Sequence, residues 1–170
     1  MSLPFKKTNL RHLNGRHARG ASLIEILIAV FVLTIGILGM AAMQARAIKG
    51  NLSSMQRTQA VMLSYYILDV MRVDKDTAKT LGYNTGSLDT ATGLIGPACV
   101  PASYSGTTLV QNNMRHWVQS IKNNVGTAGD NTSCGAVLCD SDGVCRVQVR
   151  WDDSRAGGLG VQFVETSSRL

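Results

Sequence analysis

The residues best suited to covalent chemistry in this 170-residue chain are four cysteines: Cys99, Cys134, Cys139 and Cys145. Paired cysteines in a small domain indicate disulfides and an oxidising compartment. Four thiolates could instead hold zinc. However, intervening stretches of 34, 4 and 5 residues do not form the C-x-x-C pairs typical of structural zinc sites. We therefore expect disulfides and no metal site.

Other catalytic chemistry has few candidates in this sequence. After the first 20 residues the only histidine is His116, and there is no G-x-S-x-G, H-E-x-x-H or phosphate-binding glycine motif. Asp140 and Asp142, followed by Gly143, resemble the start of a calcium loop, but the later ligands and the closing glutamate are missing. We therefore expect a turn at this position, no cofactor and no enzymatic activity.

A single carboxylate, Glu25, precedes a long apolar segment. Residues 26–45 carry no charge, and a helix of 20 residues at about 1.5 Å per residue spans the roughly 30 Å hydrocarbon core of a bilayer. An ionised carboxylate in such surroundings costs about 2.5 to 3.5 kcal/mol even on lenient insertion scales. The segment is therefore a predicted membrane anchor, and Glu25 needs a partner.

Positive charge is concentrated before the anchor, in Lys6, Lys7, Arg11, Arg16 and Arg19. This charge keeps the N-terminal end in the cytoplasm. A secretory signal peptide has a shorter apolar core and is cut after that core, so it fits poorly. Removing these five from the 17 basic residues leaves 12 against 11 acidic ones, with no basic face interleaved with aromatics. We therefore expect no nucleic-acid partner.

The junction Gly20-Ala21-Ser22-Leu23-Ile24-Glu25, followed by the apolar segment, resembles the class III leader of type IV prepilins. The resemblance implies that residues 1–20 are a leader. A prepilin peptidase/N-methyltransferase would cut between Gly20 and Ala21 and methylate Ala21. The resemblance also assigns Glu25 to docking, through a pair with the N-terminal amine of the next subunit. Two departures are Ala21, where prepilins usually have phenylalanine, and Ala42, where major pilins often have proline.

Within this family the chain resembles the minor pilins most. The resemblance implies a non-enzymatic filament subunit that takes part in pilus assembly or priming, and so in adhesion and twitching motility. Its partners would be the major pilin, other minor pilins, the peptidase and the assembly platform. It would sit in the bacterial inner membrane with a periplasmic C-terminal domain, and then enter the pilus. Alternatives are a pseudopilin of a type II secretion system and a periplasmic binding domain on a plain signal anchor.

Apolar residues at helical spacing continue past the anchor. They are Ile48, Leu52, Met55, Gln59, Met62, Tyr66 and Val70, with glutamine the single polar member. No proline lies between Ala21 and Met71, so we predict one helix of about 50 residues. Residues 21–45 would form its membrane segment and 46–72 an amphipathic continuation. We expect this stripe to cover the core of the chain's own domain. The alternative adds a second face that contacts neighbouring subunits.

Residues 73–170 are expected to form one periplasmic domain. The predicted fold class is α+β and pilin-like, with the long helix packed on a small antiparallel sheet beside a second short helix. Glycines and prolines indicate connecting loop over residues 73–105. Thr107 or Thr108 can then cap the second helix. Its apolar positions are Val110, Met114, Trp117, Ile121 and Val125.

The last third of the chain predicts strands. Val147, Val149 and Trp151 alternate with Arg146, Gln148 and Arg150, which indicates one buried and one solvated face. A three-residue loop, Ser141-Asp142-Gly143, would place Cys139 opposite Cys145. This register favours a Cys139–Cys145 disulfide and leaves Cys99 with Cys134; Cys134 with Cys145 is the rival. We predict a further strand over Leu159–Glu165, with Val161 and Phe163 on the core face.

Overall fold

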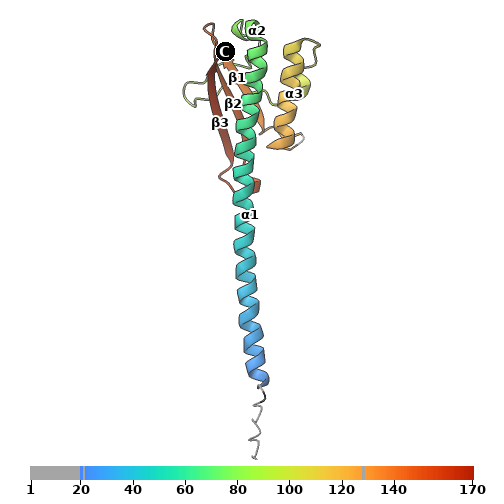
Figure 1. The fold of residues 1–170 in the computed structure, drawn as a ribbon, viewed down its shortest axis with the longest axis vertical. Helices are drawn as coiled ribbons and strands as arrows, with labels where there is room; N and C mark the ends of the chain where they lie inside the picture. The colour runs from blue at the N-terminus through green and yellow to red at the C-terminus, as the bar shows by residue number, and fades with distance from the viewer. Residues whose placement is uncertain (1–19, 21, 128) are drawn as a thin grey trace, which may run out of the picture. The chain divides into compact units, whose positions relative to one another are not determined.

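The computed structural model describes residues 20, 22–127 and 129–170. It has the predicted α+β arrangement, in which a long N-terminal helix packs on a small three-stranded antiparallel sheet beside a shorter helix (Figure 1). The chain divides into two compact units, Met1–Ala42 and Met43–Leu170.

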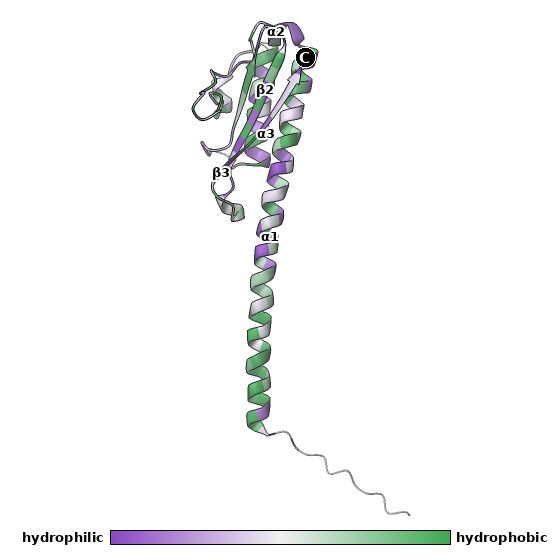
Figure 2. Ribbon diagram, turned by 90° about the vertical axis from the view of Figure 1, so that its left-hand side faces the viewer, coloured by the Kyte–Doolittle hydropathy of each residue, from purple (hydrophilic) through white to green (hydrophobic). Residues whose placement is uncertain are grey.

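The long helix α1 (Leu23–Val73) has 51 residues, which confirms the predicted helix of about 50 residues. Gly36 and Gly39 lie within it without ending it. All described residues of the Met1–Ala42 unit are exposed. Most of these residues are hydrophobic, as the green colour of this part of α1 shows (Figure 2).

The sheet consists of β1 (Cys134–Cys139), β2 (Val144–Asp152) and β3 (Val161–Arg169), in the order β1-β2-β3. Cys139 pairs with Cys145 across the first hairpin. The Asp140 amide donates to the Val144 carbonyl at 3.0 Å, and Gly143 has a left-handed φ of 81°. The predicted three-residue turn is therefore confirmed.

Two disulfides connect the domain, Cys139–Cys145 and Cys99–Cys134. This is the pairing that the hairpin register favours, and the rival Cys134–Cys145 pairing is not formed. Cys139–Cys145 links neighbouring strands, whereas Cys99–Cys134 ties the long loop before α3 (Leu109–Asn124) to the start of β1.

The core lies between the sheet and the helices α1 and α3. From α1 it receives Ala60, Ile67, Leu68 and Met71; from β2, Val147, Val149 and Trp151; and from α3, Met114, Trp117, Val118 and Ile121. The Trp117 indole Nε1 donates to the Leu63 carbonyl at 2.8 Å, so α1 and α3 are also joined by a hydrogen bond. A Cβ on Gly135 would lie 2.4 Å from the Trp117 ring, which explains why β1 needs glycine there.

The second helix begins as predicted. The Thr108 hydroxyl accepts a hydrogen bond from the Gln111 amide at 3.3 Å and caps α3. The loop before it contains a short helix that the sequence pattern did not predict, α2 (Lys75–Lys79), and two isolated bridges, Leu88 with Ile95 and Ala98 with Gly135.

Two sequence predictions about β3 are wrong. The strand runs over Val161–Arg169 instead of Leu159–Glu165. Val161 and Phe163 are 60% and 46% exposed, on the face away from the core. Residues opposite each other in a sheet point to the same side, and Phe163 lies opposite Arg150, whereas Val164 lies opposite Val149 and packs on the core. A shift of one residue in register moves every side chain to the other face.

The second face of β2 is also less solvated than predicted. Gln148 is only 3% exposed. Its Oε1 accepts from the Ile95 amide at 2.9 Å, and its Nε2 donates to the Gly93 carbonyl and to Glu165. The loop before α3 therefore folds over the middle of this face, while Arg146 and Arg150 remain partly exposed.

Candidate functional site on α1

Gly20 lies just before α1 in an exposed position. No described heavy atom lies within 4 Å of the place where a Cβ on Gly20 would stand. A larger side chain there would meet no obstacle in the described part of this chain. The described part of the chain therefore gives no steric reason for glycine at this position. Ala21 and the rest of the predicted leader lie outside the described residues.

Glu25 lies in the first turn of α1, where its amide donates to the Ser22 carbonyl at 2.9 Å. The helix dipole favours a negative charge at this end by about 0.3 to 1 kcal/mol, which is less than the cost of placing the charge in lipid. Within the described residues the carboxylate has no hydrogen bond or ion pair. The geometry thus leaves Glu25 available to a partner from outside the described chain.

The segment after Glu25 is long and apolar enough to cross a membrane. Its large side chains, such as Phe31 and Leu38 at 63% and 70% exposure, contact no core. Apart from the neighbouring residues and the backbone of α1 itself, no described atom lies within 4 Å of the place where a Cβ on Gly36 or Gly39 would stand, so both are open to close approach by another helix. Among the described residues, α1 is the one helix that is long and apolar enough to span a membrane.

Beyond the anchor, most of the predicted apolar stripe does not lie on the core of the domain. Ile48, Met55, Met62 and Tyr66 are 67%, 55%, 58% and 46% exposed. The face of α1 that packs on the sheet contains instead Ala60, Ser64, Ile67, Leu68 and Met71. Val70 packs against the core, but the expectation that the stripe lies on the chain's own core is wrong for Ile48, Met55, Met62 and Tyr66. The physical reason is that helical spacing defines an apolar side of α1 but does not decide which side the rest of the domain packs against.

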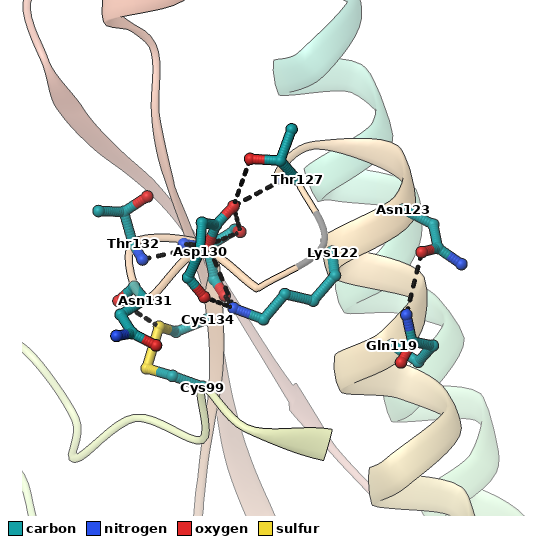
Figure 3. A network of polar contacts seen from close by, with 10 residues as sticks. Cys99, Gln119, Lys122, Asn123, Thr127, Asp130, Asn131, Thr132 and Cys134 are labelled. Carbon is teal, nitrogen blue, oxygen red and sulfur yellow. Dashed lines mark hydrogen bonds and ion pairs between the residues drawn. A yellow bond between two sulfur atoms is a disulfide. The ribbon is translucent and has the colours of Figure 1, made fainter. Parts of the chain in front are cut away.

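A buried lysine is the most constrained polar group outside α1. Lys122 on α3 is 3% exposed. Its Nζ donates to the Asp130 carboxylate at 3.1 Å, to the Asp130 carbonyl, and to the Ser133 carbonyl at 2.9 Å (Figure 3). Sequence reasoning missed it, although Lys122 falls beside Ile121 on the buried side of the predicted helix.

Asp130 organises the loop that leads into β1. Its carboxylate accepts from the amides of Thr127, Thr132 and Ser133 at 2.6, 3.1 and 2.8 Å and from the Ser133 hydroxyl. Burial raises the pKa of Asp130, but these hydrogen bonds and Lys122 outweigh burial and hold the pKa well below its usual range. The carboxylate is thus charged at neutral pH.

This network is structural in character. A cavity of about 260 Å³ adjoins Lys122 between α3 and the Cys99–Cys134 connection. However, the ammonium has three protons, and it donates all of them within the protein. Lys122 therefore has no donor left for a ligand in that cavity. His116 lies on the outer side of α3, away from this network.

Comparison with protein-family models, with curated proteins and with solved structures finds no match for this chain. The exposed surface of α1 therefore provides the evidence on function. In the described residues no three His, Cys, Asp or Glu side chains come together in a way that could hold a metal ion.

Proposed function

We propose that this chain is a minor pilin of a type IV pilus. It would be a non-enzymatic subunit whose α1 leaves the inner membrane and enters the helical core of a filament. Its partners would be the major pilin, other minor pilins, the prepilin peptidase/N-methyltransferase and the assembly platform. Residues Ser22 to Glu25 and the run Thr34-Ile35-Gly36-Ile37-Leu38-Gly39-Met40 resemble minor pilins of the PilV type most.

The observation that carries the proposal is the exposed apolar stripe of α1 beyond the anchor. A bilayer explains exposed apolar side chains over residues 26–45, but Met55 and Tyr66 lie about 15 and 30 Å further along the helix. Contiguous exposed apolar surface on a protein marks a binding surface. A bundle of the same helices from neighbouring subunits would bury both the anchor and the stripe.

Glu25 supports the same arrangement. Its carboxylate has no partner in the described residues, and the hydrocarbon core of a bilayer cannot supply one. In a bundle of staggered helices it would meet the N-terminal amine of Ala21 on the next subunit. That pair would set the axial register as each subunit docks.

The alternatives use α1 differently. A periplasmic binding domain on a plain signal anchor needs the segment 26–45 but has no use for an apolar stripe above it. A type II secretion pseudopilin would use the stripe and Glu25 in the same way, so the filament in which the chain is recovered separates it from a pilin.

The test replaces two stripe residues, Met55→Lys with Met62→Lys. Both side chains are exposed, so the domain should fold and the chain should insert. Burying two lysines in a helix bundle should lower recovery in sheared pili about tenfold or more relative to the membrane level. The matched control is Asn51→Lys with Thr58→Lys, at exposed polar positions of the same helix.

Three outcomes would contradict the proposal. The stripe variant could be recovered in pili as efficiently as the control. N-terminal sequencing of the membrane form could show that residues before Ala21 persist. The wild-type chain could be found in a secretion pseudopilus and not in pili, which would favour the pseudopilin.

A further inference from the structure

A cleft lies where α1 leaves the predicted anchor. Arg46, Lys49, Gly50 and Ser53 form its α1 side, and Ala156, Gly157 and Gly158 form the other side; its volume is about 350 Å³. The loop is fixed to α1 because the Ser53 hydroxyl donates to the Asp153 carboxylate at 2.7 Å. A Cβ on Gly157 would lie 3.2 Å from Lys49 Cδ, so the loop rests on the lysine stem.

The two cations of the cleft are uncompensated in the described structure. Arg46 and Lys49 are exposed, and neither forms an ion pair or side-chain hydrogen bond with a described residue. Asp153 accepts from the Ser53 hydroxyl and is 5% exposed, and it does not line the cleft. The residues that line the cleft therefore carry two positive charges and no negative one.

The height of the cleft matches the headgroup layer. Arg46 follows the last anchor residue directly, and Lys49 lies four residues beyond Ala45, about 6 Å along the helix. The headgroup region adds about 5 to 7 Å to each side of the hydrocarbon core. Both cations thus fall at the depth where phospholipid phosphates lie.

An apolar side chain projects from the same loop. Leu159 is 98% exposed. It lies between Gly157 and Gly160, which have left-handed φ values of 82° and 95°. Val161, the first residue of β3, continues the apolar surface at 60% exposure. Leu159 directly follows Gly158, the last residue of the cleft wall. An exposed leucine next to such a pair of cations suits the boundary between headgroups and acyl chains.

We propose that Arg46, Lys49 and the loop 156–160 form a binding site for the headgroup of an anionic phospholipid on the periplasmic side of the membrane. The cations hold the phosphate, and Leu159 enters the acyl boundary. The contact holds the domain against the bilayer until α1 is withdrawn. The inference rests on the membrane anchor of the proposed function and not on filament membership.

The test measures lipid affinity of the full chain in neutral detergent by native mass spectrometry. Probes are phosphatidylglycerol, phosphatidylcholine and inorganic phosphate. A basic residue near an anionic lipid surface contributes roughly fivefold in affinity, so Arg46→Gln with Lys49→Gln should weaken phosphatidylglycerol binding about 25-fold. The matched control, Arg57→Gln with Lys75→Gln, removes the same charge further along the chain and should bind like the wild type.

A second pair of variants tests the apolar contact. Leu159→Asp should weaken phosphatidylglycerol binding, whereas Leu109→Asp, at another exposed leucine, should not. Three results would overturn the inference. The wild-type chain could bind phosphatidylglycerol and phosphatidylcholine with equal affinity. The cleft variant and its control could bind phosphatidylglycerol equally well. Inorganic phosphate could compete fully with phosphatidylglycerol while Leu159→Asp has no effect. If the wild-type chain prefers phosphatidylglycerol but does not enter filaments, that result would count against the proposed function and not against the lipid site.

Discussion

Replacing Lys122 by methionine should destabilise the domain strongly without changing its fold. Methionine fills a similar volume on α3 but donates no hydrogen bond. The change would leave the Ser133 and Asp130 carbonyls without their donor and the Asp130 carboxylate without its cation.

The expected magnitude follows from the burial of each group. Removing one member of a buried ion pair costs about 3 to 5 kcal/mol when the remaining charge is isolated. Asp130 is less isolated, because its side chain is 18% exposed and accepts from three amides and a hydroxyl. We therefore expect the lower end, about 3 kcal/mol in the free energy of unfolding, which corresponds to roughly 10 °C in Tm for a domain of this size.

The measurement is thermal unfolding of the full chain in detergent, followed by near-ultraviolet circular dichroism of the buried Trp117 and Trp151. Both disulfides are kept oxidised in every variant. Lys75→Met is the matched control, because Lys75 is exposed and should cost less than about 0.5 kcal/mol. A loss in Lys122→Met no larger than in Lys75→Met would refute the structural role of the buried ammonium.

The dependence of stability on acid pH tests the same Lys122–Asp130 network in a second way. The pKa of Asp130 is held below its usual range in the folded state, so the stability that the carboxylate contributes is fully present above about pH 5 and is lost as the pH falls below about 4. Asp130→Asn should remove this acid dependence. Lys122→Met should reduce it, since it removes one of the groups that lower the pKa.

Other variants test the disulfides and the N-terminal site. Cys99→Ser with Cys134→Ser opens a connection with a sequence separation of 35 residues and should cost about 3 to 4 kcal/mol in urea unfolding on the chain-entropy model; an unchanged midpoint would contradict this. Gly20→Val should accumulate in the membrane with its leader attached, and normal processing would argue against the predicted cleavage. Glu25→Ala should insert, be cleaved and fold, yet be lost from sheared filaments, whereas wild-type recovery would leave Glu25 without a docking role.

Local sequence patterns were enough to predict most of the elements. The long helix follows from spacing of three or four and the absence of proline, α3 from its apolar positions and the Thr108 cap, and the first hairpin from Gly143 in its turn. These features depend on interactions between residues close in sequence. The pairing of Cys139 with Cys145 follows from the hairpin in the same way.

The buried face of each helix and strand was harder to predict than the element itself, because burial depends on what packs against that face. The stripe from Ile48 to Tyr66 has helical spacing, yet the buried side of α1 is the neighbouring one, which contains Ala60 and Ile67. Phe163 has the spacing of a core residue in an alternating strand, but the cross-strand register places it outside.

Composition and local spacing specify the apolar segment 26–45, the lone carboxylate Glu25 and most elements of the domain. Tertiary packing was needed to show which face of α1 remains free and that Arg46 and Lys49 share a cleft with Gly157. The reason is that long-range packing selects one among several faces that local patterns leave equally possible. No periodicity along the chain connects residues 46–53 to 156–158, about a hundred positions later.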